Sequence, residues 1–228
     1  MIDITKNKEC FMEIINNKVN RPGRDALVQY LEDKTDFFEA PASTMFHLSC
    51  EGGLVQHSLN VYDCMRSKRE NPIWKNVFEG VSEESLAIMA LLHDVCKANF
   101  YISGYKDQKT YDSEKIKAAP PKDVKEDGRG PFIWESVMRY EVDDMYPLGH
   151  GEKSALLVQQ YMPLKCSELF AIRWHMGYTE EKTQYRTLDE AVEKYPIVLA
   201  LHEADLEASK LMEDKNDNKA LQTELITT

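Results

Sequence analysis

Residues 86–97 read LAIMALLHDVCK, an unbroken apolar run that ends in a histidine, an aspartate and, three residues later, a lysine. Leu86 and Met89 precede His93 at helical spacing, and Asp94 is turned by about 100° around the same helix. The run therefore predicts a buried helix with two ionisable groups at its end. Buried groups of this kind need a partner, because unpaired polar atoms are costly away from water.

The same helical spacing of apolar residues recurs along most of the chain, with little sustained alternation. The predicted fold class is mainly α, a helical bundle. The expected helices span 5–18, 22–33 with Pro22 in the first turn, 54–70 after Gly52-Gly53, 83–99 after Ser82, 151–162, 167–176 after Ser167, and a segment 188–212 in which Pro196 marks a helix start and Thr187 to Lys194 form a separate short turn.

Residues 100–147 differ in kind, since they are richer in proline and carry a glycine-containing turn. The turn Gly128-Arg129-Gly130 separates VKE (124–126) from FIW (132–134), which predicts a hairpin. We interpret this segment as an insertion between core helices. The expected organisation is a helical lead-in over 1–40, a main domain over 41–212 that contains the insertion, and a polar tail over 213–228, frayed or docked in an oligomer.

Composition restricts the partners of the chain. The 228 residues include 28 Lys or Arg and 39 Asp or Glu, a formal net charge of −11, which disfavours long nucleic acid and anionic membranes. An anionic substrate would have to be held locally, by a metal or a few placed cations. No signal peptide or membrane span is visible, and the five cysteines form no C-x-x-C pair, so we expect a cytoplasmic protein.

Asp205 is the clearest case of a charged side chain at a position that the pattern predicts to be buried. On a helix its face also holds Val198, Leu201 and Ala208, so the carboxylate points where an apolar stripe points. Such a group must pair, take up a proton or coordinate a metal. A lone histidine on an apolar face is more often an ordinary core residue than a metal ligand. Several histidines and aspartates at such positions on separate helices are better explained as metal ligands. The set here comprises His57, His93, Asp94, His150, His175 and Asp205, which is suitable for a pair of first-row metal ions.

The order of these residues resembles the HD superfamily of metal-dependent phosphohydrolases, in the phage-type and bacterial variant with two extra histidines. The matching strings are GGLVQHSLNV, LLHDVCK, GHGEKS, IRWHMG and ALHEADLEAS, which lie between Ala40 and Met212. The resemblance implies an HD-domain bundle over 41–212. The upstream strings RPGRDALVQYLE and APASTMFHL also look like the lead-in of that subgroup.

The resemblance further implies a dinuclear centre. One metal would be held by His57, His93, Asp94 and Asp205, and the second by Asp94, His150 and His175, with Asp94 bridging. The cofactors would be two divalent ions, with Fe, Mn, Ni, Co, Zn and Mg all open. Such a pair acidifies a water and clamps phosphoryl oxygens, so the protein need not supply a nucleophile.

Four more residues are candidate substrate contacts. Lys97 matches the lysine of the family's HD-x-x-K signature, which implies a catalytic role on the substrate phosphate. His47 is either a substrate contact or a surface loop residue. Lys153 and Arg173 are weaker candidates, for which a solvated or structural ion pair is the better interpretation.

Two further interpretations concern residues beside this set. His202 is read as an ordinary, partly exposed histidine rather than a support for a ligand. The aromatic residues of the insertion, Trp134, Tyr140 and Tyr146, either wall the substrate pocket or form a small core of the insertion itself.

The leading hypothesis is a phosphohydrolase acting on a phosphate monoester or phosphodiester of a small substrate, a nucleotide or short oligonucleotide. One alternative is a mixed-valent diiron oxygenase, because the same superfamily with the same ligands includes such enzymes. A second is a nucleotide-binding module without turnover. The ligand set does not separate hydrolase from oxygenase, and the oligomeric state stays open.

Overall fold

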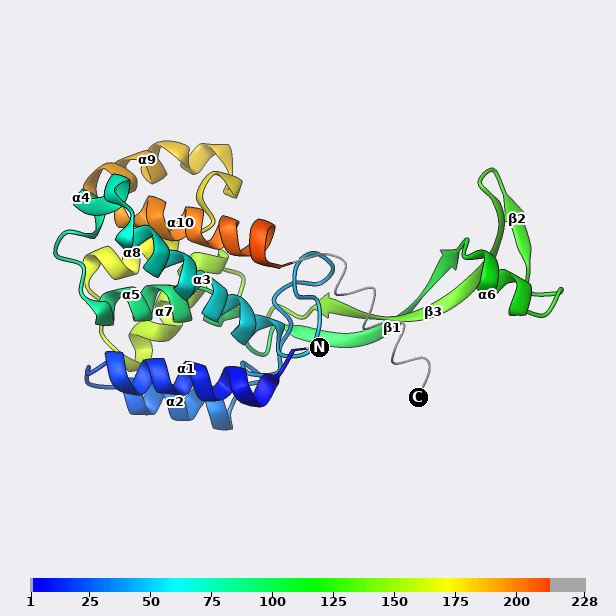
Figure 1. The fold of residues 1–228 in the computed structure, drawn as a ribbon, viewed down its shortest axis with the longest axis horizontal. Coiled ribbons are helices and arrows are strands. Elements are labelled where there is room, and N and C mark those ends of the chain that lie inside the picture. The colour runs from blue at the N-terminus through cyan, green and yellow to red at the C-terminus, as the bar shows by residue number, and fades with distance from the viewer. Residues whose placement is uncertain (1, 214–228) are drawn as a thin grey trace.

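Helix α5 (Glu83–Leu92) lies at the centre of the helical body of this computed structural model, which describes residues 2–213. Every residue from Ser85 to Leu92 is buried, as expected for a helix that is apolar all round. It packs against α1 (Ile4–Lys18), α3 (Gly53–Glu70) and α8 (Cys166–Trp174). Figure 1 shows the remaining helices around this centre. They are α2 (Arg24–Asp33), α4 (Lys75–Phe78), α7 (His150–Tyr161), α9 (Tyr185–Lys194) and α10 (Ile197–Glu207).

The mainly α class is confirmed, and several predicted helix ends are corrected. The helix predicted over 83–99 stops at Leu92, because His93 and Asp94 form a turn before the short 3-10 helix η2 (Val95–Lys97). The predicted short turn 187–194 is instead the helix α9, and α10 follows Pro196 as predicted. The π-helical turn η5 (Ala208–Met212) extends α10.

Two predicted helix starts are also wrong. Pro22 lies outside α2, which begins after Gly23, a residue at φ 90°. A Cβ at Gly23 would lie 1.8 Å from the Tyr161 carbonyl oxygen, so the chain needs glycine for both conformation and space. Helix α8 begins at Cys166 rather than after Ser167, because the Lys165 N–H donates to the side chain of Glu168.

The predicted insertion is an arm that projects from the helical body (Figure 1). Strand β1 (Tyr101–Thr110) pairs antiparallel with β3 (Gly130–Val142), which also pairs with β2 (Lys125–Asp127), and α6 (Ser113–Ala118) lies near the tip. The predicted hairpin is confirmed as β2 and β3, with Asp127 opposite Gly130 across a two-residue turn. The long β1 and β3 ribbon was not predicted, because both of its faces meet solvent and its alternation is broken.

The arm contributes nothing to the core of the helical body. Among the described residues, none from 101–147 belongs to either apolar core cluster. The arm instead has its own small apolar contact, where buried Phe132 packs against Trp134 and Tyr111. Trp134 therefore packs within the insertion, as one of the two interpretations held, but it covers Phe132 from the surface and is itself exposed. Tyr140 packs on Tyr101 at the base, with ring centroids 6.4 Å apart.

Of the predicted tail over 213–228, only Glu213 lies within the described residues, and it is buried. Within residues 2–213, no helix combines the length and apolar character needed to cross a membrane.

Candidate metal centre

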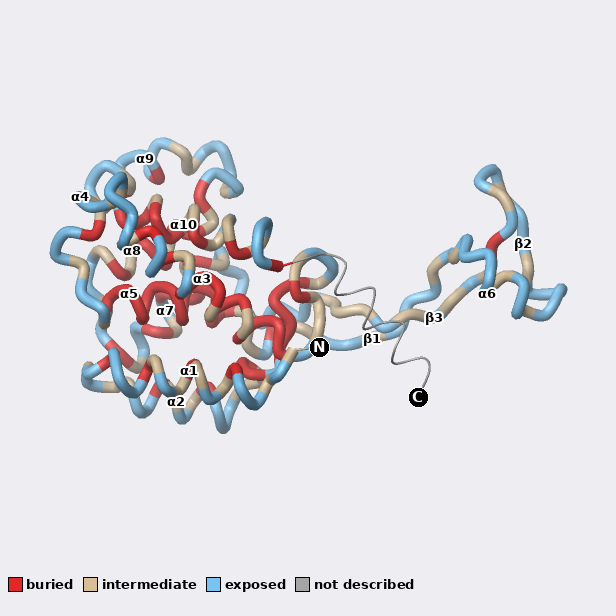
Figure 2. The backbone as a smooth tube through the Cα atoms, viewed as in Figure 1, coloured by how far each residue is buried: buried red, intermediate tan, exposed pale blue. Residues whose placement is uncertain are grey.

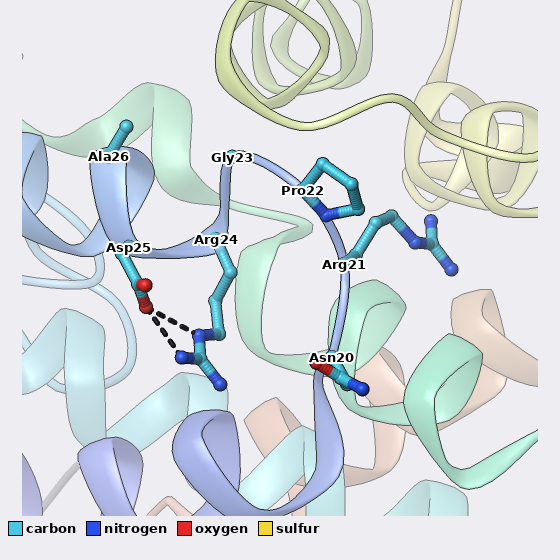
Figure 3. A pocket seen from close by; sticks show the side chains of 7 residues that line it. All are labelled: Asn20, Arg21, Pro22, Gly23, Arg24, Asp25 and Ala26. Carbon is cyan, nitrogen blue, oxygen red and sulfur yellow. Dashed lines mark hydrogen bonds and ion pairs between the residues drawn. The ribbon is translucent and has the colours of Figure 1, made fainter.

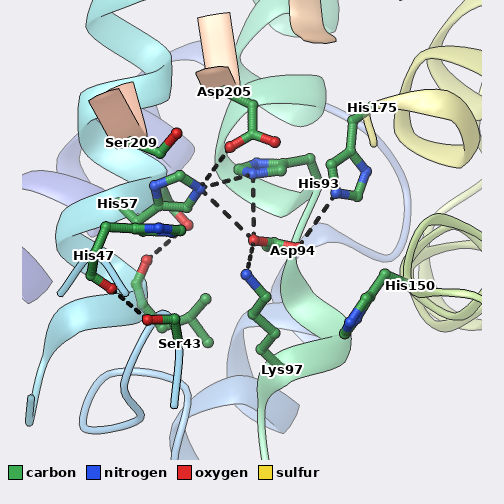
Figure 4. Close-up of polar contacts among 12 residues, drawn as sticks. Ser43, His47, His57, His93, Asp94, Lys97, His150, His175, Asp205 and Ser209 are labelled. Atoms are coloured by element: carbon green, nitrogen blue, oxygen red, sulfur yellow. Dashed lines mark hydrogen bonds and ion pairs between the residues drawn. The ribbon is translucent and has the colours of Figure 1, made fainter. Parts of the chain in front are cut away.

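Four helices place five of the predicted ligands at one point inside the bundle (Figure 4). His57 comes from the second turn of α3, His93 and Asp94 from the C-terminal end of α5, His175 from the residue after α8, and Asp205 from α10. Each position lies at the end or on the inner face of an apolar helix. The three histidine side chains are fully buried.

Short distances connect these side chains. His57 Nε2 lies 3.1 Å from Asp205 Oδ1, 3.3 Å from His93 Nε2 and 3.7 Å from Asp94 Oδ2. On the other side of Asp94, Oδ1 lies 3.4 Å from His175 Nε2. Two groups, His57 with His93 and Asp94, and His93 with His175 and Asp205, each offer ligand atoms within 4.8 Å of one another. The structure thus brings together the whole predicted first ligand set and His175 of the second.

The remaining ring nitrogens set the orientation of two histidines. His93 Nδ1 donates to the Ala90 carbonyl oxygen at 2.8 Å, and His175 Nδ1 donates to that of Ile172, also at 2.8 Å. Both bonds reach back three residues to the last turn of the preceding helix, where carbonyl groups lack helical partners. With the proton on Nδ1, each Nε2 presents a lone pair to the cluster, which is the usual arrangement for a metal-bound histidine.

The donor set fits a divalent metal. Asp94 Oδ1 and His175 Nε2 are buried and have no hydrogen-bond partner among the described residues. Orphaned buried polar atoms are rare in folded proteins, and an ion between them would satisfy both. Imidazole nitrogens with carboxylate oxygens suit Mn, Fe, Co, Ni or Zn. The structure therefore supports a buried cluster that could hold a metal ion.

The charges in the cluster depend strongly on one another. Burial lowers the pKa of His57, but hydrogen bonds to Asp205 and Glu213 outweigh it and raise the pKa to about 10, so a metal at Nε2 would have to displace a proton. Burial lowers the pKa of His93 to about 4. Burial would raise the pKa of Asp94, yet the nearby cation Lys97 and the imidazoles hold it well below its usual range. Asp94 is thus a carboxylate at neutral pH, which is the form a metal binds.

Lys97 reaches the cluster from η2 rather than from the helix that carries His93, which corrects the predicted single helix. Its Nζ lies 2.6 Å from Asp94 Oδ2, and its side chain is 12% exposed. Burial acts to lower the pKa of Lys97, but Asp94 outweighs burial and the pKa is raised. A lysine cation therefore faces the cluster at neutral pH (Figure 4).

His47 lies in a loop beside the cluster, where it is partly buried rather than solvated. Its ring centroid is 5.0 Å from that of His57, and its side chain is 19% exposed. Burial lowers its pKa to about 4. Contact with a substrate stays a prediction.

His150 belongs to neither of these two ligand groups and lies beside them. Its Nδ1 is 3.4 Å from Cys96 Sγ, and its ring packs edge-on against Phe100. Figure 4 shows it beyond Lys97, on the side of the cluster away from His57. Its role as a ligand therefore stays a prediction.

Lys153 and Arg173 form structural ion pairs, which was the preferred interpretation of both. Lys153 Nζ lies 2.5 Å from Asp144 Oδ1, and Arg173 pairs with Glu152 and Glu180, each at 2.9 Å.

His202 contacts a predicted ligand through the backbone. Its side chain is half-buried, and its Nδ1 donates to the carbonyl oxygen of His175 at 2.8 Å. It thus supports the position of His175 without joining the cluster. The interpretation of His202 as an ordinary, partly exposed histidine missed this support.

Sequence reasoning missed Glu213. Its Oε1 accepts hydrogen bonds from His57 Nδ1 and from Asn60 Nδ2, both at 2.9 Å. Glu213 follows the π-helical turn Ala208–Met212, whose wider period shifts the register away from that of an α-helix. The position of Glu213 therefore does not follow from α-helical spacing alone.

The pocket in Figure 3 does not coincide with the candidate metal centre. Residues 20–26, in the loop between α1 and α2 and the first turn of α2, line it, and it includes none of the cluster residues.

Fold and cluster together define a mainly α protein with a candidate metal centre. Comparison of the chain with protein-family models, with curated proteins and with solved structures finds no match in any of the three.

Proposed function

We propose that this chain is a metal-dependent phosphohydrolase similar to the HD superfamily, acting on a small phosphate ester, a nucleotide or a short oligonucleotide. The observation that carries the proposal is the convergence of His57, His93, Asp94, His175 and Asp205, with buried donor atoms left unpaired. This ligand chemistry is what metal-assisted phosphoester hydrolysis requires.

The residues divide between two metals as the resemblance implies. His57, His93, Asp94 and Asp205 would hold one ion, and Asp94 would share the second with His175. His150 completes that second set only if its ring turns from Cys96 toward Asp94. When bound, the ions supply Lewis-acid polarisation of a phosphoryl oxygen and a water of lowered pKa.

Lys97 and the overall charge support a small substrate. The Lys97 ammonium at the cluster provides a fixed positive charge where a phosphate oxygen gains negative charge. The formal charge of −11 opposes the approach of long nucleic acid, while a locally held phosphate needs only the ions and Lys97.

Elemental analysis of the purified protein followed by a substrate panel tests this proposal. We expect bound transition metal, and hydrolysis of some nucleotide mono- or diesters by an anaerobic, manganese-loaded sample. Asp94→Ala should lose metal and activity together, because it removes the carboxylate that would serve both ions.

Other outcomes would overturn the proposal. Oxygen-dependent product formation that needs iron would identify an oxygenase instead. Saturable nucleotide binding without product after long incubation with Mn²⁺, Fe²⁺ or Ni²⁺ would identify a binding module. Full metal content in Asp94→Ala would refute the assignment of the ligands.

A further inference from the structure

Four buried side-chain atoms have no hydrogen-bond partner among the described residues, and they form two pairs. Asp94 Oδ1 and His175 Nε2 are the first pair and belong to the centre already described. His47 Nε2 and Glu213 Oε2 are the second, 3.9 Å apart. Each pair consists of one imidazole nitrogen and one carboxylate oxygen. The second pair lies on the other side of His57, and neither of its two atoms belongs to the ligand sets proposed for that centre.

The spacing of the second pair suits an ion better than a direct contact. A hydrogen bond needs a separation of about 2.7–3.2 Å, so these two atoms do not bond each other. Ligand atoms at about 2.0–2.2 Å from one metal ion lie up to roughly 4 Å apart, depending on the angle at the metal. A cation between His47 and Glu213 would satisfy both atoms without moving either far.

Hydrogen bonds hold the Glu213 carboxylate in this orientation. Its Oε1 accepts from His57 Nδ1 and Asn60 Nδ2, which leaves Oε2 directed toward His47. The Asn60 side chain is held in turn by Gln56, whose Nε2 donates to Asn60 Oδ1 at 2.8 Å. The Glu213 side chain is fully buried, so its free oxygen cannot be satisfied by bulk water.

The backbone around His47 is also held in place. Ser43 Oγ donates to the His47 carbonyl oxygen at 2.7 Å, and the Ala42 N–H donates to Leu48 at 3.0 Å. Leu48 at φ 44° completes this tight loop. The ring of His47 is therefore presented to Glu213 by a short closed loop.

We propose that His47 and Glu213 form an outer cation site for a divalent transition-metal ion such as Mn²⁺, separate from the inner centre. His57 stands between the two sites, with Nε2 facing the inner ligands and Nδ1 bonded to Glu213. The outer ion would have two protein ligands and its other positions open to water or to a substrate oxygen. The site rests on these contacts alone and does not depend on the chain being a hydrolase.

Counting bound Mn²⁺ in the full-length chain tests the site. Metal-free protein is titrated with Mn²⁺, and the electron paramagnetic resonance signal of the free ion gives the number bound. We expect wild type to bind one more equivalent per chain than either His47→Phe or Glu213→Gln. Phenylalanine keeps a ring without a ligand nitrogen, and glutamine keeps an oxygen for the bonds to His57 and Asn60.

A matched control separates the two sites. Asp94→Asn should lose Mn²⁺ bound at the inner centre and keep the Mn²⁺ bound at the outer site. His47→Phe and Glu213→Gln should do the reverse. Wild-type stoichiometry in both His47→Phe and Glu213→Gln would overturn the proposal, and so would the loss of every equivalent in a variant with unchanged circular dichroism. If His47→Phe fails to fold, Glu213→Gln decides the question alone.

Discussion

Asp94 is surrounded on both carboxylate oxygens by groups that can carry positive charge. Oδ2 meets Lys97, His57 and His93, and Oδ1 faces His175. A carboxylate with 2% of its side chain exposed needs such surroundings, because an isolated buried charge is very costly. At the residue scale, the chemistry of the centre is therefore concentrated in one side chain and its four neighbours.

Replacing Lys97 should separate metal binding from turnover. In Lys97→Met we expect bound metal to persist, because the proposed ligands are unchanged, while kcat on a hydrolysed substrate falls by about 10²–10³-fold with the loss of a charge on the phosphate. Elemental analysis and steady-state kinetics measure the two quantities. Lys97→Arg is the charge-retaining control. Unchanged kcat in Lys97→Met would contradict the assigned role.

At the element scale, one arginine joins three parts of the bundle. Arg21, in the loop between α1 and α2, binds Glu168 of α8 through two nitrogens at 2.5 and 2.9 Å, and Glu84 of α5 at 2.7 Å. The Glu168 side chain is fully buried. This contact helps to place α8, and so His175, against α5.

Breaking this contact should destabilise the fold in a pH-dependent way. Burial acts to raise the pKa of Glu168, but the hydrogen bonds to Arg21 outweigh it and lower the pKa. The stabilisation is therefore fully present above the unfolded-state pKa of about 4.3 and is lost as pH falls through the lower folded-state pKa. Arg21→Met should cost about 3–5 kcal/mol at pH 7, because it leaves a buried carboxylate unpaired.

Urea unfolding measured from pH 7 down to pH 4 checks this expectation. The difference in unfolding free energy between wild type and Arg21→Met should shrink toward pH 4, since the unpaired Glu168 takes up a proton in the variant. The double variant Arg21→Met, Glu168→Gln should recover part of the loss. A pH-independent difference would show that Glu168 does not carry the effect.

A second contact between elements depends on glycine. At Gly151 in α7, a Cβ would lie 2.0 Å from the Arg173 carbonyl oxygen in α8. Gly151→Ala should push the two helices apart and cost about 1–3 kcal/mol of unfolding free energy. Gly149→Ala is the matched control, because its Cβ would find no atom closer than 3.8 Å. Equal denaturation midpoints for the two variants would refute the close packing.

At the scale of the whole molecule, the chain has a helical body that holds the apolar core and a projecting arm, 101–147, that contributes no residue to it (Figures 1 and 2). The arm joins the body close to the centre, since β1 begins four residues after Lys97 and the segment after β3 leads into His150. Its Tyr105 is 78% exposed, and Trp134 is 49% exposed on the same face of the ribbon. The arm therefore adds exposed aromatic surface without supporting the bundle.

Removing most of the arm should leave the body intact. The variant lacks residues 104–139. A short glycine-containing turn joins Ser103 to Tyr140, because these two residues pair directly across the ribbon. We expect this variant to keep the metal content and thermal midpoint of wild type. The reason is that no described residue of 101–147 packs in the helical core. A loss of cooperative unfolding would show that the arm is needed for folding.

Apolar periodicity in the sequence was sufficient to predict most helices and the mainly α class, because a helix that buries one face must repeat apolar residues every three to four positions. Helix ends were less predictable. The start of α2 after Gly23 depends on a contact with another element, because the Tyr161 carbonyl leaves space only for glycine at that position.

The residue types and order of His57, His93, Asp94, His175 and Asp205 are visible in the sequence, and so is their suitability for a metal. Their convergence was decided only by the tertiary structure, since helical spacing fixes neighbours on one helix and not between helices. The same reason accounts for Glu213. Its place beside His57 depends on a π-helical turn and on contacts 156 residues apart in the chain, which no local pattern encodes.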